Sequence, residues 1–180
     1  AYQTYSQTAH VQYGGVVPEI ASRGHLAAVR KVVVKTLAIA NITLDDIGAI
    51  AVTNKPGLAG SLLVGFCYAK AIAWVKKIPF IPVNHLEGHI FSSFLEVDGS
   101  VRDQIGFPHL CLTASGGHTA LYMVEDFGTF TLLAQTRDDA AGEAFDKIAK
   151  LIGFGYPGGA TIERLASEAN FQDFFHYPRT

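Results

Sequence analysis

The sequence predicts an α/β protein in which a mixed sheet is flanked by helices. In the first half of the chain, short apolar segments alternate with longer amphipathic segments, an order typical of parallel strands joined by helices. In the second half, three strand-like segments follow one another through Gly-containing turns, which indicates an antiparallel meander. With 180 residues, 49% hydrophobic and 17% charged, the chain has the size and composition of one globular domain.

The first half is predicted to contain two strand–helix units. An amphipathic helix is indicated by apolar residues that repeat along one face from Leu26 to Leu37, with Ser22 as a candidate cap. A short apolar strand then runs into a Gly-rich turn that opens a second helix. The predicted elements of this half are a helix over 20–39, a strand over 47–53, a helix over 62–76 and a strand over 80–83.

The second half is predicted to begin with strands and to end with helices. The strands are separated by turns that contain glycine, and a turn over 153–159 separates the two helices. The predicted elements are strands over 109–113, 119–124 and 129–135, followed by helices over 140–152 and 161–169.

Charge and cysteine content narrow the class of protein. The formal net charge of −2 gives no broad basic surface, so the charge of the chain does not by itself indicate a nucleic-acid partner. Cys67 and Cys111 lie in separate apolar segments and are interpreted as buried, reduced thiols, which fits a cytoplasmic protein. The longest apolar stretch, Leu58 to Val75, is interrupted by Lys70 and by glycines, so no membrane span is expected.

A pair of histidines follows the second predicted strand, in the segment Asn84-His85-Leu86-Glu87-Gly88-His89. At the start of a helix, residues four apart project from the same face, so His85 and His89 can hold one metal ion. The end of a strand is also where ligands bind in open α/β sheets. The alternative is that both histidines only cap or pack the helix.

The spacing argues against a zinc protease. That class needs H-E-x-x-H, with the glutamate directly after the first histidine as general base. Here Leu86 occupies that position, and Glu87 lies about 200° around the helix from His85, away from the side that would face a metal.

A second candidate site is the segment Thr113-Ala114-Ser115-Gly116-Gly117-His118-Thr119 between two predicted strands. Adjacent glycines let a ligand approach the backbone, and their N–H groups can cradle a phosphate. Ser115 and Thr119 can add hydroxyl donors. The alternative is a plain hairpin turn. A role for Ser115 as a hydrolase nucleophile is disfavoured because G-x-S-x-G is absent.

Two further segments carry polar groups close to a predicted helix start. After Asp139, a candidate cap, Glu143 and Asp146 share a helix face and could bind ribose hydroxyls or a cation, although acidic residues in a first turn also favour the helix dipole. The turn Pro157-Gly158-Gly159 could let a flat ligand such as adenine lie against the backbone, or could simply join two helices.

Another segment, from Tyr13 to Arg23 with the nearby His25, combines two glycines, an acid and a base within a loop. Loops of this composition often contact substrate, whereas a solvated helix entry is the simpler interpretation.

Five motifs in order resemble one family. They read HVQYGGVVPEIASRGHL, VTNKPGLAGSLLVGFCYAKAIA, PVNHLEGHI, TASGGHTAL and DDAAGEAFDKIAKLIGFGYPGG. Together they resemble TsaD, the tRNA N6-adenosine threonylcarbamoyltransferase family, formerly called the glycoprotease or O-sialoglycoprotein endopeptidase family. The resemblance runs nearly end to end.

The resemblance implies a fold and an activity. The fold would be the actin-like ATPase fold of actin, Hsp70 and sugar kinases, built from ribonuclease-H-like lobes. The activity would be transfer of the threonylcarbamoyl group from threonylcarbamoyl-AMP to N6 of the adenosine beside the anticodon, in tRNAs that read codons starting with A. The acyl transferase would be cytoplasmic.

The resemblance also implies site residues and cofactors. The metal ligands would be His85 and His89, for one divalent metal, Fe²⁺ or alternatively Zn²⁺. An adenine nucleotide, threonylcarbamoyl-AMP or ATP, would be the second ligand. The residues implied to bind it are Thr113, Ala114, Ser115, Gly116, Gly117, Asp146, Gly159 and Glu163.

Three departures from the family pattern limit this expectation. The family's first strand, with its acidic loop, is expected to be missing, and residues 2–6 read as the middle of a strand. The C-terminal lobe, which supplies an Asp metal ligand and an Asn that contacts the nucleotide, is also expected to be absent. Some members have a Tyr ligand where this chain has Thr113. The chain over 1–180 is therefore expected to be one domain, most of an N-terminal lobe, and inactive alone.

The resemblance implies partners and leaves alternatives open. Expected partners are tRNA, a TsaB-like paralogue with a TsaE-like ATPase or KEOPS-type subunits, and a dimer through the N-terminal lobe, without membrane association. The alternatives are a non-catalytic TsaB-like subunit, which lacks the His pair, and a small-molecule kinase of the same fold, which has no use for it. A metalloprotease is the least favoured.

Overall fold

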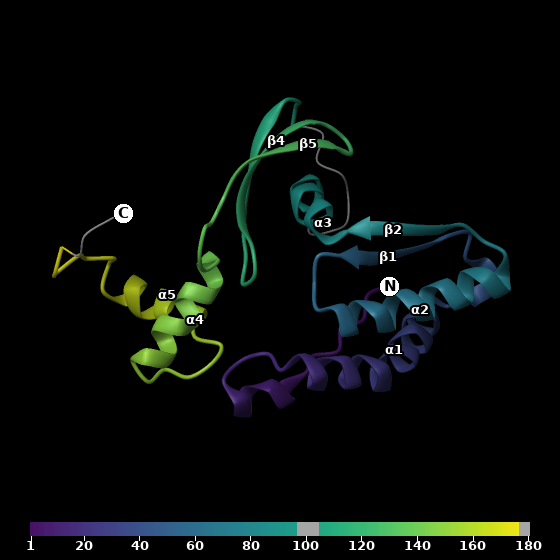
Figure 1. Cartoon of the computed structure of the whole chain (residues 1–180), viewed down its shortest axis with the longest axis horizontal. Helices are drawn as coiled ribbons and strands as arrows, with labels where there is room; N and C mark the ends of the chain where they lie inside the picture. The colour runs from purple at the N-terminus through teal and green to yellow at the C-terminus, as the bar shows by residue number, and fades with distance from the viewer. Residues whose placement is uncertain (97–104, 177–180) are drawn as a thin grey trace. The chain divides into compact units, whose positions relative to one another are not determined.

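A computed structural model describes residues 1–96 and 105–176 of the chain (Figure 1). The chain divides into two compact units, Ala1–Gly106 and Phe107–Thr180, and each unit is described by itself. That one lobe contains both units, as the sequence analysis expects, stays a prediction. Both units combine helices with strands, which confirms the predicted α/β class.

The first unit is a parallel strand pair with helices. Its elements are η1 (Thr8–Tyr13), α1 (Pro18–Ala40), η2 (Leu44–Asp46), β1 (Ile50–Lys55), α2 (Ala59–Lys76), β2 (Phe80–Asn84), α3 (His85–Phe91) and η3 (Ser92–Phe94). In Figure 1, β1 and β2 run side by side in the same direction, α1 and α2 lie on one side of them, and α3 continues from the end of β2. The expected strand–helix–strand order is therefore confirmed.

Small residues let the helices of this unit approach closely. A Cβ atom on Gly60 of α2 would lie 2.3 Å from Ser22 Oγ of α1, so a larger residue there would require the Ser22 side chain to move. Ala69 and Ala73 of α2 are buried, and Phe66 packs edge-to-face on Phe80 of β2 with ring centroids 5.0 Å apart. These contacts fix α2 against the strand pair.

Three expectations for this unit are wrong. Ser22 is no cap: α1 begins at Pro18, whose fixed φ suits a first helical position, and the Ser22 hydroxyl donates to Pro18 O. Residues 1–7 form no strand, because none of the described strands pairs with them. Cys67 is exposed and not buried. The prediction was wrong because apolar residues occur on every side of α2, so the sequence does not reveal which side is covered.

The second unit is an antiparallel meander followed by two helices. Its elements are β3 (His109–Ala114), β4 (Thr119–Asp126), β5 (Thr129–Gln135), α4 (Ala141–Leu151) and α5 (Gly159–Glu168). The strand order is β3-β4-β5, with Thr113 opposite Ala120 in the first pair. These elements confirm the predicted meander and both predicted helices.

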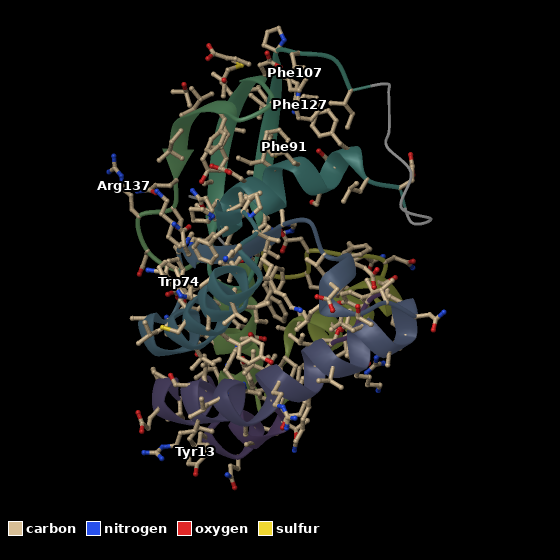
Figure 2. All side chains as sticks on the ribbon, turned by 90° about the vertical axis from the view of Figure 1, so that its right-hand side faces the viewer. Tyr13, Trp74, Phe91, Phe107, Phe127 and Arg137 are labelled. Atoms are coloured by element: carbon tan, nitrogen blue, oxygen red, sulfur yellow. The ribbon has the colours of Figure 1, made fainter. Side chains whose placement is uncertain are left out.

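Alternate residues of β4 form the interior side of this sheet. Ala120, Tyr122 and Val124 are buried, and Val124 has no exposed surface. Phe107 and Phe127, labelled in Figure 2, pack edge-to-face with ring centroids 5.1 Å apart. None of the helices described is both long and apolar enough to cross a membrane.

Candidate metal and nucleotide sites

The two histidines of the HxxxH motif lie together. His85 is the first residue of α3 and His89 lies one turn later, and their Nε2 atoms are 3.0 Å apart. The ring centroids are 4.3 Å apart with the planes inclined by 66°. The start of the helix is fixed by Asn84, whose side-chain oxygen accepts a hydrogen bond from Leu86 N at 3.0 Å.

This geometry suits two ligands of one metal ion. A metal bonded to imidazole nitrogens at about 2.1 Å separates two such nitrogens by about 3 Å when the N–metal–N angle is near 90°. The Nε2 atoms already have that separation. Within residues 1–96 and 105–176, however, no third His, Cys, Asp or Glu joins them in a cluster. The pair supplies two positions of a coordination sphere, and a complete site needs further ligands.

The His pair lies at the carboxyl edge of the parallel strands. Lys55, the last residue of β1, is opposite Asn84, the last residue of β2, and His85 follows directly. The edge formed by the carboxyl ends of parallel strands is the usual ligand-binding edge of an open α/β sheet. The position of the motif in the fold therefore matches the expectation from its sequence.

In the second unit, the glycine segment forms the tight turn between β3 and β4. Ser115 N donates to His118 O at 2.8 Å, and His118 N donates to Ser115 Oγ at 3.0 Å. No hydrogen bond is formed by Gly116 N or Gly117 N with any residue described, and a Cβ atom on either glycine would meet nothing within 4 Å. The segment is thus both a hairpin turn and an open pair of backbone donors.

The hydroxyl groups of this segment are used inside the fold. Thr113 is buried, and its Oγ1 donates to Ala120 O at 3.2 Å across the strand pair. Ser115 Oγ closes the turn through His118. Both side chains hold the shape of the hairpin, so ligand contacts in this region are left to the backbone. Ala114 is exposed at the end of β3.

The start of α4 is attached to the hairpin. Ala141 N donates to Thr119 Oγ1 at 2.8 Å, and Gly142 N donates to Ser115 O at 3.0 Å. A Cβ atom on Gly142 would lie 2.7 Å from Gly116 Cα, so only glycine fits there. The N-cap residue is Ala140 and not Asp139, because a hydroxyl from β4 takes the capping role.

Asp146 holds the turn that precedes α5. Its Oδ1 accepts a hydrogen bond from Gly158 N at 2.8 Å. Gly158 is buried against α4, and a Cβ atom there would lie 1.9 Å from Ala149 Cβ. Gly159 begins α5, and Glu163 is exposed on its surface. The structure therefore brings Asp146 and the Pro-Gly-Gly turn together. This contact could not be predicted from the sequence.

Asp139 and Glu143 have a partner of their own. Lys147 pairs with Asp139 and, at 3.1 Å, with Glu143. Hydrogen bonds to Asp139 and then to Glu143 raise the pKa of the Lys147 ammonium above its usual range. The sequence allows Glu143 and Asp146 to share a ligand, whereas in the structure each carboxylate has a separate partner.

The loop around Tyr13 is held by its own polar contacts. Val17 N donates to His10 Nδ1 at 3.3 Å, and Gln7 contacts both His10 and His25. Glu19 and Arg23 form an exposed i,i+4 pair, typical of a solvated helix. These contacts favour the simpler interpretation, a helix entry, over a substrate loop.

Comparison with known proteins decides the family. A family model described as TsaD, tRNA N6-adenosine threonylcarbamoyltransferase, matches residues 1–180. The chain belongs to the TsaD family. It is 54% identical over 170 residues to a protein of this description from Syntrophus aciditrophicus, covering 94% of this chain and 48% of the relative. A relative from Clostridium perfringens is 51% identical over 170 residues, again with 94% and 48% covered.

The chain spans about half the length of these curated TsaD relatives. Among solved structures, YeaZ from Pseudomonas aeruginosa superposes with a TM-score of 0.42 at 17% identity, over 66% of this chain and 55% of that one.

Two features of this TsaD-family chain escaped the sequence analysis. The sequence places Gly142 in an acidic helix start. A glycine lowers the stability of a helix, and its presence here is explained by the close approach of Gly116. Thr119 was considered as a possible ligand donor, whereas its hydroxyl caps α4. Both contacts depend on distant parts of the chain that meet only after folding.

Proposed function

We propose that the full-length protein containing this chain transfers a threonylcarbamoyl group to tRNA. The donor is threonylcarbamoyl-AMP, and the acceptor is N6 of the adenosine next to the anticodon in tRNAs that read codons starting with A. The observation that carries the proposal is the pair of Nε2 atoms 3.0 Å apart in a chain of the TsaD family. A TsaB-like subunit or a small-molecule kinase does not need a pair of metal-binding histidines for its function.

The reaction is an acyl transfer. The exocyclic amine of adenosine attacks the carbamoyl carbon, a C–N bond forms, and the bond between that carbon and the phosphate oxygen breaks. AMP leaves with the electron pair, and the amine loses a proton to solvent. His85 and His89 would hold one divalent metal, Fe²⁺ or Zn²⁺, which when bound supplies Lewis acidity toward a carbonyl oxygen.

The second unit would bind the adenylate. The unused N–H groups of Gly116 and Gly117 suit phosphate oxygens, because backbone donors at such turns form anion-binding concavities. Asp146 holds the turn before α5 and would position Gly159 and Glu163 near the ribose and base. In this proposal Thr113, Ala114 and Ser115 shape the hairpin and do not supply side-chain ligands.

The partners follow from the same proposal. The full-length protein would act on tRNA in the cytoplasm, together with a TsaB-like paralogue and a TsaE-like ATPase or with KEOPS-type subunits. Pairing with the paralogue would use the lobe that contains α1 and α2. The 180-residue chain alone would be inactive, because no third His, Cys, Asp or Glu joins the His pair within residues 1–96 and 105–176.

The test is a transfer assay with the full-length protein, its partner subunits, threonylcarbamoyl-AMP and unmodified tRNA. Nucleoside mass spectrometry should detect threonylcarbamoyladenosine in tRNAs that read codons starting with A. Controls are a tRNA with another base at that position and the 180-residue chain alone, neither of which should give product. Modification of the control tRNA would contradict the proposed acceptor, and absence of product with every tRNA would contradict the function.

A further inference from the structure

A cavity lies at the carboxyl end of β1, within the first unit. Its volume is about 550 Å³, and it is lined by Asn54, Lys55, Pro56, Gly57, Ala59, Leu62, Leu63 and Phe66. The carboxyl end of a parallel strand is where ligands bind in open α/β sheets. None of the residues that the sequence analysis assigned to metal or nucleotide lines this cavity.

An irregularity in the strand pair accompanies two consecutive polar residues in the lining of this cavity. Successive side chains of a regular strand point to opposite faces. In the β1–β2 register, Thr53 is opposite Val83 and Lys55 is opposite Asn84, so Asn54 is an extra residue in β1. Such a bulge re-aims side chains, and both Asn54 and Lys55 accordingly line the same cavity.

Lys55 is the charged residue of the lining, and its ammonium is available. Over the part of the chain that the structure describes, it forms no ion pair and no hydrogen bond. The side-chain amide of Asn54 adds a donor next to it. Leu62, Leu63 and Phe66 form the apolar wall of the same cavity. One cation, one amide and an apolar wall suit a small aliphatic group that carries one carboxylate.

The cavity lies at the same strand edge as the His pair. Lys55 is the register partner of Asn84, and His85 is the next residue along the chain. Lys55 and the imidazole pair therefore lie at the same end of the strand pair, within one compact unit.

We infer that this cavity is the subsite for the amino-acid part of the acyl donor, with Lys55 binding its carboxylate and Asn54 assisting. The apolar wall takes the aliphatic part of the threonyl group. This inference rests on the proposed function, since it assigns a binding role within the same reaction. Lys55 is a substrate-binding residue in this scheme and takes no part in proton transfer.

The test measures binding and not turnover. In the full-length protein, calorimetry would give dissociation constants for a non-hydrolysable threonylcarbamoyl-AMP analogue and for AMP. Lys55→Met should weaken the analogue about tenfold, the effect of one charge-assisted contact at a partly exposed site. AMP affinity should not change, because AMP lacks the carboxylate. Lys55→Arg should restore most of the analogue's affinity.

Two controls test whether the contact between Lys55 and the carboxylate of the analogue accounts for the change in affinity. Lys70→Met removes a lysine from the exposed side of α2, away from this edge, and should leave both affinities unchanged. An analogue with its carboxylate replaced by a carboxamide should bind the wild type about tenfold more weakly and should bind Lys55→Met no more weakly than the acid does.

The outcomes separate this inference from the proposed function. If the wild type binds AMP and the analogue but Lys55→Met binds the analogue equally well, the inference is overturned and the proposed function stands. If the wild type binds neither ligand, the proposed function is overturned, and the inference with it.

Discussion

Gly142 at the start of α4 lies directly against Gly116 of the β3–β4 hairpin, where a Cβ atom would approach Gly116 Cα to 2.7 Å. The hydrogen bond from Gly142 N to Ser115 O, 3.0 Å long, joins the same two segments. The shape of the open glycine turn therefore depends on a residue more than twenty positions later. In the proposed function, this contact holds the phosphate donors in place.

Gly142→Ala should displace the hairpin. The added methyl group meets backbone atoms, which have no rotamer with which to move aside, so a cost of about 1–3 kcal/mol in the free energy of unfolding is expected. AMP affinity in the full-length protein, measured by calorimetry, should fall at least tenfold. The control is Gly65→Ala in α2, where the nearest atom, Val52 Cγ2, is 3.9 Å away. Equal AMP affinity in both variants would contradict the role of the contact.

Asp146→Ala should loosen the turn before α5, because Gly158 N loses its acceptor. Adenylate affinity is expected to fall severalfold while the metal content stays unchanged. Asp146→Asn keeps an acceptor oxygen and should have a smaller effect. Calorimetry and elemental analysis on the same full-length samples would check both. Unaltered nucleotide affinity in Asp146→Ala would remove this residue from the nucleotide site.

Gly158→Ala should destabilise the pairing of α4 with α5, because its Cβ would lie 1.9 Å from Ala149 Cβ. A loss of about 1–3 kcal/mol is expected from denaturant unfolding. Ala149→Gly removes the opposing atom, so the double variant should cost less than the sum of the single variants. Strictly additive costs would show that the two residues do not meet.

Lys147 should titrate above the ordinary lysine value of 10.5, because Asp139 and Glu143 favour its charged form. Its folded pKa lies above the unfolded one, so the pairing stabilises the fold fully below the unfolded pKa. That contribution is lost as the pH rises through the folded pKa. An NMR titration of the Lys147 side chain, with Asp139→Asn as the variant that should lower the value, would check this. A Lys147 pKa at or below the ordinary lysine value of 10.5 would contradict it.

Much of the fold could be predicted from local patterns. Three strand-like segments joined by Gly-containing turns predicted the meander, because turn chemistry depends on neighbouring residues. The start of α1 was placed too late, because Pro18 was not recognised as a first helical residue. Residues 2–6 contain Tyr and Thr, which are common in strands, but a strand also needs a partner, which local sequence does not reveal.

The candidate site was predictable where it lies within one short motif. HxxxH at a helix start brings two imidazoles together through helical spacing alone, and the structure has them in contact. Contacts between distant segments were not predictable. The hydroxyl of Thr119 caps α4, and Asn54 and Lys55, at the bulge in β1, both line one cavity. Both depend on strand register and packing, which local sequence does not encode.

The most direct test of the central claim is the metal content of the full-length protein. Elemental analysis would compare the wild type with His85→Ala, His89→Ala and, as a matched control, His176→Ala, an exposed histidine in the second unit. We predict close to one equivalent of iron or zinc in the wild type and in His176→Ala, and a loss of metal and of threonylcarbamoyl transfer in both other variants. Full metal content in His85→Ala and His89→Ala would contradict it.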